Sequence, residues 1–422
     1  MRVVVVSQYY PPEGAAAFYP ASVARELAAR GHDVRVITGY PNYPGGRLFA
    51  GFHQRWRSFE LDEDNLEVMR VPLYIDHSPS GFRRMLNYLS FGLSAAGARR
   101  WLIEADIIYV YATQMTPAIG PWLRRMLGGV PYVLHVQDLW PDSITGSSMA
   151  GSDRMKRIID RLLTPWLRSV YHHADAVIGI APTMVQTLVS RGVAPNKVHL
   201  VYNWSPDVAD REEIRHNASA SNAGHTRLLY AGNVGNMQDL GTLVRAVARL
   251  GPIGVELRVL GDGVALDSLQ SIVERERISN VIFEGRVPMD EMERFYSWAD
   301  YSVVTLRDLA AFRGTIPSKF QASIAHGVPI ITNVQGDLRT LVEGAGLGFT
   351  SDAEDVEALA CAIERAVNAT PDQHSSMSAA ARCLHKQEFS VSASVRTIEA
   401  LLMDAVGASR ISNIDTVLEE AS

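Results

Sequence analysis

One lysine of this chain stands where a cation could bind phosphate. Lys319 follows Pro317 and Ser318 at the start of a predicted helix over 320–325, and Arg313 lies just before them. Proline and serine are favoured at helix starts, where unpaired amide groups attract anions. A lysine in the first turn opposes the helix dipole, and a diphosphate facing it would explain that placement. The alternative is a solvated lysine on a helix surface.

A loop with glycines offers a second anion site. Gly232, Asn233 and Gly235 follow the apolar run 228–231, and apolar residues at helical spacing begin at Leu240. Glycine lets a ligand approach the backbone closely, and the helix start behind the loop attracts anions. The loop lacks the glycine pattern of a dinucleotide site and the Gly-Lys-Ser/Thr of a P-loop, so NAD binding and ATP hydrolysis are disfavoured. An ordinary tight turn is the alternative.

A similar unit opens the chain. Valines at 3–6 predict a buried strand, and a small-residue loop with Glu13 and Gly14 leads into a helical stretch. Two such units predict an α/β protein with two Rossmann-like, doubly wound domains that face each other across a cleft. Ligands are expected at the carboxyl ends of the strands.

A histidine and a carboxylate end another predicted strand. His135 follows the apolar residues 132–134, and Asp138 comes three residues later. At the carboxyl end of a strand, His135 could act in catalysis and Asp138 could hold a hydroxyl group or orient the imidazole. A lone histidine in this place is also a common structural hydrogen-bonding group, so both interpretations stay open.

The length of 422 residues suits two domains. We predict a first domain over 1–205, a polar linker over 206–225, a second domain over 226–406 and a loose tail over 407–422, with a final helical stretch that could cross back to the first domain. The predicted strands are 3–6, 34–38, 107–111, 132–136 and 177–180, then 228–231, 257–260, 281–284, 302–306 and 330–332.

The composition, 47% hydrophobic and 20% charged, is typical of a soluble globular protein. The two cysteines have no metal-ligand spacing, and no secretory leader or apolar run of membrane-spanning length is recognised, so a cytoplasmic location is predicted. Residues 1–205 carry 21 Lys and Arg against 16 Asp and Glu, whereas the rest of the chain carries 19 against 30. The basic first half indicates an anionic partner or a membrane surface.

The order of these motifs resembles glycosyltransferase family 4, which has the two-domain GT-B fold, and especially its bacterial surface-polysaccharide branch. The combination covers most of the chain and is more specific than any one motif. The resembling segments are 9–15, 30–34, 135–143, 230–233, 260–263, 316–319 and 325–329.

The resemblance implies transfer of a sugar from a nucleotide diphosphate sugar with retention at the anomeric carbon. It implies a cell-envelope or exopolysaccharide acceptor, free or lipid-linked, and no nucleic acid partner. No metal or other cofactor is required in such a mechanism, so cations and helix amides must stabilise the leaving diphosphate. The acidic run 62–64 is interpreted as a solvated turn rather than a metal site.

The resemblance also assigns roles to residues of this chain. His135, Asp138 and Lys319 are the catalytic candidates, and Glu13 and Gly14 lie on the acceptor side. The donor-binding candidates are Gly232, Asn233, Gly235, Arg286, Arg313, Ser318 and Lys319.

Two departures from the family pattern keep rival functions open. Asn233 and Gln238 stand in a loop where the family typically has a basic residue, and Gly314 and Ala322 replace the family's pair of glutamates. The rivals are a GT-B nucleotide-sugar 2-epimerase and a non-catalytic GT-B partner subunit.

The stretch 82–102 has apolar residues at helical spacing and arginines at both ends. Such a helix can lie at a membrane interface, which would place the protein peripherally at the inner face of the cell membrane. The alternative is a helix packed on the sheet of its domain, with its arginines reaching into solvent.

Overall fold

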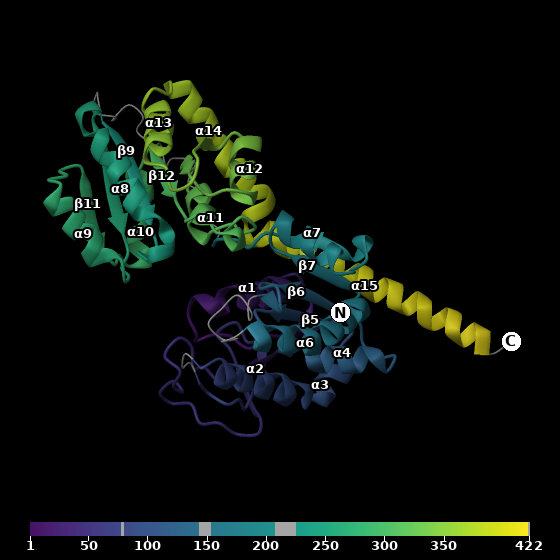
Figure 1. Ribbon diagram of the computed structural model, residues 1–422. Coiled ribbons are helices and arrows are strands. Elements are labelled where there is room, and N and C mark those ends of the chain that lie inside the picture. The colour runs from purple at the N-terminus through teal and green to yellow at the C-terminus, as the bar shows by residue number, and fades with distance from the viewer. Residues whose placement is uncertain (77–79, 143–152, 207–224, 421–422) are drawn as a thin grey trace. The chain divides into compact units, whose positions relative to one another are not determined.

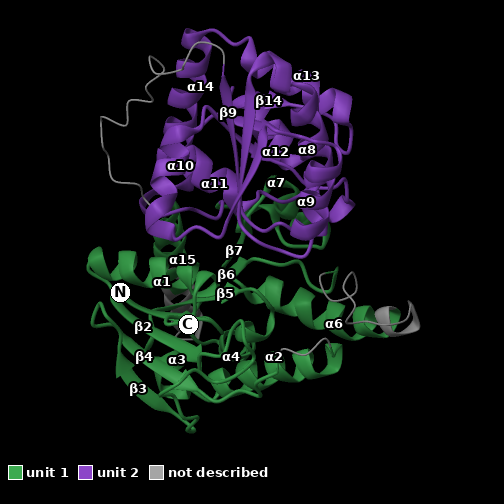
Figure 2. Ribbon diagram, turned by 90° about the vertical axis from the view of Figure 1, so that its left-hand side faces the viewer, with its two compact units in different colours: residues 1–201, 394–422 green, residues 202–393 purple. Residues whose placement is uncertain are grey.

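A computed structural model describes residues 1–76, 80–142, 153–206 and 225–420 (Figure 1). The chain forms two compact units: unit 1 comprises residues 1–201 and 394–422, and unit 2 comprises residues 202–393 (Figure 2). Each unit is an α/β domain built on a largely parallel sheet. The two predicted Rossmann-like domains are thereby confirmed.

The unit boundaries differ from the predicted ones at the C-terminal end. The predicted second domain extended to residue 406, with a final helical stretch that could cross back to the first domain; residues 394–422 belong to unit 1. Glu399 of helix α15 (Val391–Glu420) explains this, because its carboxylate accepts a hydrogen bond from Arg30 at 3.2 Å and lies 2.8 Å from His32 Nε2. The tail predicted to be loose after Gly407 continues as helix to Glu420. Most of the predicted linker lies outside the described residues.

Unit 1 is built on an eight-stranded sheet in the order β3-β4-β2-β1-β5-β6-β7-β8. Strand β3 runs antiparallel to β4, and the other neighbours pair in parallel. The strands are β1 (Arg2–Val6), β2 (Asp33–Gly39), β3 (Ser58–Leu61), β4 (Glu67–Val71), β5 (Ile107–Ala112), β6 (Tyr132–Val136), β7 (Ala176–Gly179) and β8 (Val198–Leu200).

Helices cover both faces of this sheet, which is why its central strands are continuous runs of apolar residues. Helix α1 (Ala15–Ala29) lies beside α15 through Arg30, and α2 (Gly81–Ala96) packs against α4 (Ile119–Met126). The other helices of unit 1 are α1 (Ala15–Ala29), α2 (Gly81–Ala96), α3 (Arg99–Glu104), α4 (Ile119–Met126), α6 (Asp153–His173) and α7 (Pro182–Ser190).

Unit 2 is built on a six-stranded parallel sheet in the order β11-β10-β9-β12-β13-β14. Successive strand residues point to opposite faces: Leu228 and Tyr230 pack with α8, α9 and α13, and Leu229 packs with α10. The strands are β9 (Thr226–Ala231), β10 (Val255–Leu260), β11 (Val281–Gly285), β12 (Tyr301–Val304), β13 (Ile330–Thr332) and β14 (Gly348–Thr350). The helices are α8 (Leu240–Arg249), α9 (Leu266–Arg275), α10 (Met292–Trp298), α11 (Ser318–Ala325), α12 (Asp337–Gly344), α13 (Val356–Val367) and α14 (Pro371–Leu384).

Candidate functional site

The loops after β9 and β10 of unit 2 lie back to back at the carboxyl edge of the sheet. The Gly232 amide donates to Leu260 O at 2.9 Å, and the Val234 amide donates to Asp262 O at 2.9 Å. A Cβ at Gly261 would lie 1.9 Å from Gly232 O, so no side chain fits there. Gly232 itself has a φ of 149°, a conformation that favours glycine. The two loops therefore form one backbone-lined surface.

Lys319 of α11 reaches into this surface. Its Nζ donates to Tyr230 Oη at 2.9 Å and to Gln238 Oε1, and it lies 4.3 Å from the centroid of the Tyr230 ring. A Cβ at Gly232 would lie 3.5 Å from Lys319 Cε. The structure thus brings together the lysine and the glycine loop that the sequence singled out.

No carboxylate forms a described ion pair with Lys319, and its nearest acceptors are neutral oxygens. Although part of the residue is exposed, its ammonium end is surrounded by protein atoms, and this desolvation lowers the pKa of Lys319 to about 7. An anion placed beside it would favour the charged form. The site is therefore suited to a phosphate that supplies the missing negative charge.

A hydrogen-bonded network that the sequence did not predict holds the β9 loop in place. Tyr230 Oη donates to Asn233 O at 2.6 Å, and Thr305 Oγ1 donates to Gln238 O at 2.6 Å. Asp239 accepts from Asn333 Nδ2 at 2.7 Å. Burial raises the pKa of Asp239. Polar residues at strand ends are the sequence signal that could have indicated this network. Their hydrogen-bonding partners, however, are distant in the sequence.

The remaining donor-side candidates occupy different parts of the same edge. Asn233 and Gly235 lie in the β9 loop, and Ser318 begins α11. Arg286 follows β11 and pairs with Asp262 at 3.3 Å. Arg286 therefore lies on the β10 and β11 side of the backbone-lined surface, whereas Ser318 belongs to the helix that carries Lys319.

Arg313 is not joined to Lys319 by any described interaction. Its guanidinium makes two hydrogen bonds to Asp308, at 2.9 and 2.7 Å, on the exposed loop after β12. The Arg313 carbonyl accepts from the Asp337 amide at 2.8 Å, which fixes the loop against α12. In this arrangement Lys319, and not Arg313, reaches into the backbone-lined surface.

Ala322, at the position of the family's second glutamate, packs beside an apolar cluster. Its neighbours in that cluster include Leu229, Leu260 and Phe295. A carboxylate at 322 would therefore lie against apolar side chains, which is costly unless it reaches a polar partner.

In unit 1, Glu13 ties two loops together. Its Oε1 accepts from the amides of Asn42 and Tyr43, both at 2.8 Å, and its Oε2 accepts from the Tyr10 amide at 3.3 Å. Burial raises the pKa of Glu13, and these amide donors oppose that shift. Gly14 begins the adjoining helix α1, and a Cβ there would meet no atom within 4 Å. Glu13 thus shapes the loop, while Gly14 leaves open space above it.

His135 lies inside the sheet of unit 1 and is fully buried. Its Nδ1 lies 2.6 Å from Tyr109 Oη on the neighbouring strand, and the Tyr111 ring meets it edge to face with centroids 5.8 Å apart. Burial lowers the pKa of His135 to about 3, so the imidazole is neutral at physiological pH. This geometry favours the structural interpretation that the sequence left open.

We expect His135→Ala to lower the free energy of unfolding by about 2 to 4 kcal/mol. The change opens a cavity in the sheet and removes the partner of the buried Tyr109 hydroxyl. Urea denaturation checks this. Unchanged stability with a large loss of kcat would instead favour a catalytic histidine.

Asp138 is exposed on the loop after β6, although protein atoms around its carboxyl raise its pKa by desolvation. Trp140 of the same loop is buried, and Tyr88 lies beside it with ring centroids 6.0 Å apart. Asp138 is thus an accessible polar group of this loop.

A buried chain of side-chain amides lies at the same edge of unit 1. Gln8 donates to Asn87 Oδ1 at 2.8 Å and accepts from Gln114 Nε2. It links the residues that follow β1 and β5 to α2 at this edge of the sheet.

Comparison with known proteins decides the family. The model of the glycosyl transferase 4-like domain matches residues 14–204, and that of glycosyl transferases group 1 matches residues 225–369. The two matches follow one another and together span most of the chain. This chain belongs to glycosyltransferase family 4. It has the GT-B fold of that family.

This family 4 glycosyltransferase is 28% identical, over 382 residues, to WcaI of Escherichia coli K12, which is named as a colanic acid biosynthesis glycosyl transferase. That match covers 87% of this chain and 92% of WcaI. Among solved structures, Anabaena Alr3699/HepE in complex with UDP and glucose superposes with a TM-score of 0.64 at 14% identity, over 96% of this chain and all of HepE. WaaG, a glycosyltransferase involved in lipopolysaccharide biosynthesis, superposes with a TM-score of 0.61 at 15% identity, over 95% of this chain and 99% of WaaG.

The acidic run of this glycosyltransferase, Asp62 to Asp64, forms a turn. Asp62 accepts from the amides of Asp64 and Leu66 and from Tyr10 Oη. Across the part of the chain that the structure describes, no three His, Cys, Asp or Glu side chains are placed to hold a metal ion. Among the helices of that same part, none is long and apolar enough to cross a membrane.

Proposed function

We propose that this protein is a retaining hexosyltransferase that moves a sugar from a nucleotide diphosphate sugar to a cell-envelope or exopolysaccharide acceptor, free or lipid-linked. The observation that carries the proposal is the desolvated Lys319 ammonium beside Gly232, with no described carboxylate partner. The relation to WcaI, named for colanic acid biosynthesis, supports a polysaccharide acceptor. The complexes of HepE with UDP and UDP-glucose support the donor class.

In this reaction, the bond from the anomeric carbon to the β-phosphate oxygen breaks, and a bond to the acceptor hydroxyl oxygen forms on the same face of the sugar. The acceptor proton passes to the departing phosphate. Lys319 and the loop amides that do not bond to β10 residues or the β10 loop, those of Asn233 and Gly235, stabilise the negative charge that develops there, which is the largest contribution we assign to the protein.

We assign the acceptor to the unit 1 loops that carry Gly14 and Asp138. The open space above Gly14 admits a ligand close to the α1 helix start. The exposed Asp138 carboxylate can accept hydrogen bonds from sugar hydroxyls. His135 acts as a positioning residue, since its bond with Tyr109 fixes the end of β6 that leads to Asp138.

Calorimetric titration with UDP-, GDP- and TDP-sugars tests the proposal. We expect one donor series to bind, and Lys319→Met to abolish that binding, while Arg275→Met on the exposed face of α9 leaves it unchanged. Binding to none of the donors would favour a non-catalytic partner subunit. A donor inverted at C2, seen by NMR of the product, would favour an epimerase.

We expect EDTA to leave the rate of glycosyl transfer unchanged, because we assign the stabilisation of the leaving diphosphate to Lys319 and backbone amides. The measurement is the initial rate of product formation with and without millimolar EDTA. Loss of turnover that Mg²⁺ or Mn²⁺ restores would contradict a metal-independent mechanism.

We also propose that helix α2 contacts the membrane at the inner face of the cell. Its inner face, including Asn87 and Phe91, is buried in unit 1. Its outer face carries a stripe of exposed apolar residues at helical spacing: Phe82, Leu86, Leu89 and Leu93. Arginines flank this stripe, which is the arrangement that binds anionic lipid surfaces.

Flotation with vesicles tests this contact. We expect the protein to float with phosphatidylglycerol vesicles and not with phosphatidylcholine vesicles, and Leu93→Glu to abolish flotation. Met289→Glu is the control, because Met289 is 81% exposed but lies in unit 2. Equal flotation of wild type and Leu93→Glu would rule out the α2 stripe as the contact.

A further inference from the structure

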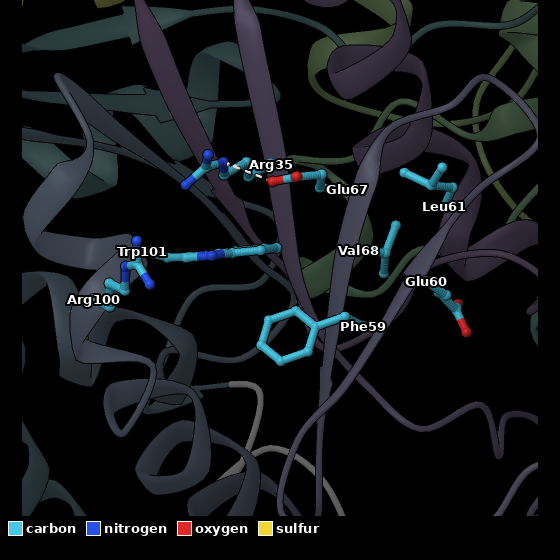
Figure 3. A pocket seen from close by; sticks show the side chains of 8 residues that line it. All are labelled: Arg35, Phe59, Glu60, Leu61, Glu67, Val68, Arg100 and Trp101. Atoms are coloured by element: carbon cyan, nitrogen blue, oxygen red, sulfur yellow. Dashed lines mark ion pairs between the residues drawn. The ribbon is translucent and has the colours of Figure 1, made fainter.

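A second concave surface lies at the outer edge of the unit 1 sheet. A pocket of about 520 Å³ is lined by side chains from β2, β3, β4 and α3 (Figure 3). Glu67, one of its residues, is the first residue of β4. The pocket therefore lies toward the amino end of that strand, whereas Gly14 and Asp138 follow carboxyl ends of strands. The proposed transfer reaction does not use it.

The pocket is built around two aromatic rings. Figure 3 shows the ring of Phe59, from the edge strand β3, beside the indole of Trp101 from α3, and their centroids are 5.8 Å apart. Phe59 and Leu61 are each 64% exposed. Edge strands usually carry charged residues that discourage association, so two exposed apolar side chains here are unusual. A ligand that covers the Phe59 ring would gain the free energy of burying a large apolar surface.

The charged groups of the pocket are balanced. Its lining has two arginines and two glutamates, and each already has an ion-pair partner. The pairs are Arg35–Glu67 at 2.9 Å, Glu60–Arg70 at 2.7 Å and Arg100–Glu104 at 2.7 Å. The pocket therefore offers no net charge to attract a nucleotide or a lipid phosphate.

The same charged groups can still bind hydroxyls. A guanidinium has five N–H donors and a carboxylate has about four acceptor sites, so one ion pair leaves most of this capacity open. Arg35 is also held in place, because its guanidinium lies 5.4 Å from the Trp101 ring centroid. Arg35 and Glu67 thus present donors and acceptors on one side of the Trp101 indole, and Phe59 lies on its other side, as Figure 3 shows.

We propose that this pocket is a binding site for a neutral sugar unit of a glycan chain. A pyranose has an apolar face of C–H groups that can cover an aromatic ring, and a rim of hydroxyls that can meet Arg35 and Glu67. The pyranose carries no charge, which suits a pocket whose arginines and glutamates are already paired. The site would hold a polysaccharide at a place separate from the loops of the transfer reaction. It goes beyond the proposed function and does not depend on which donor is used.

Saturation-transfer NMR on the full chain tests this site. The probes are cellohexaose, maltohexaose, laminarihexaose and mannohexaose. We expect at least one to bind, and Phe59→Ala to raise its Kd by about tenfold or more, the effect of removing an aromatic anchor. Phe59→Trp should retain binding. Met403→Ala, which removes an exposed apolar side chain of α15, is the matched control and should not change the Kd.

The assignment would be overturned if no hexasaccharide binds at millimolar concentration, if Phe59→Ala binds as wild type does, or if a saturating nucleotide sugar displaces the hexasaccharide. A dimer seen by light scattering that Phe59→Ala abolishes would assign the pocket to a second copy of the chain instead. Nucleotide-sugar affinity, measured on the same samples, should be equal in wild type and Phe59→Ala. Failure of wild type to bind any nucleotide sugar would count against the proposed function and not against this site.

Discussion

Lys319→Ala is expected to lower kcat/KM for glycosyl transfer by about 10²-fold or more, the loss that follows removal of one preorganised group that stabilises developing charge. Lys319 reaches into the backbone-lined surface of the β9 and β10 loops, where its Nζ donates hydrogen bonds to Tyr230 and Gln238. Initial rates at subsaturating donor give this value directly.

The fold should survive this change. Tyr230 keeps its hydrogen bond to Asn233 O when the ammonium is gone, so the β9 loop retains its support. The melting temperature of the variant should stay close to that of wild type, and Arg275→Ala, on the surface of α9, should retain full activity. If Lys319→Ala has near-normal activity and Arg313→Ala is inactive, stabilisation of the leaving diphosphate would be assigned to Arg313 instead.

The affinity for the nucleotide sugar is expected to fall by up to about tenfold per pH unit above pH 7. Desolvation lowers the pKa of free Lys319 to about 7, so the lysine is charged below that pH and loses its proton as the pH rises. The bound diphosphate favours the charged form and raises the pKa in the complex. Above pH 7, binding of the nucleotide sugar therefore requires Lys319 to take up a proton. This uptake becomes less favourable as the pH rises, so the affinity falls.

Calorimetry at pH 6.5, 7.5 and 8.5, in buffers of different ionisation enthalpy, measures both the Kd and the proton uptake. The diphosphate of a nucleotide sugar does not itself titrate in this range, so it does not contribute. Lys319→Arg is the matched control, because a guanidinium stays charged throughout and should remove the pH dependence. A wild-type Kd that is constant from pH 6.5 to 8.5 would contradict the predicted linkage.

Much of the fold was accessible from the sequence because the central strands are long and apolar. Every predicted strand from 3–6 to 330–332 corresponds to a strand of the structure. Strands β3, β4, β8 and β14 were not predicted. Strand β4 contains Arg70, whose buried guanidinium donates to Gly39 O and Pro11 O. Those partners lie at the end of β2 and in the loop after β1, so a local pattern could not show that an arginine belongs inside a strand.

The site was accessible in part for the same reason. Lys319 and Gly232 could each be recognised from local strand, loop and helix patterns. The acceptors of the lysine, Tyr230 and Gln238, lie 89 and 81 residues away in the sequence, and only the sheet brings them together. His135 shows the opposite limit: its strand-end position suggested access to ligand, but the residue is fully buried and its Nδ1 contacts the Tyr109 hydroxyl of the neighbouring strand.

A crystal structure with the nucleotide sugar that binds in the calorimetric titration is the most direct test of the claim that Lys319 and the Gly232 loop hold the donor diphosphate. We predict a phosphate oxygen about 2.7 to 2.9 Å from Lys319 Nζ, with a second oxygen at the amides of the Gly232 loop. A diphosphate bound elsewhere, with Lys319 still hydrogen-bonded only to Tyr230 and Gln238, would contradict it.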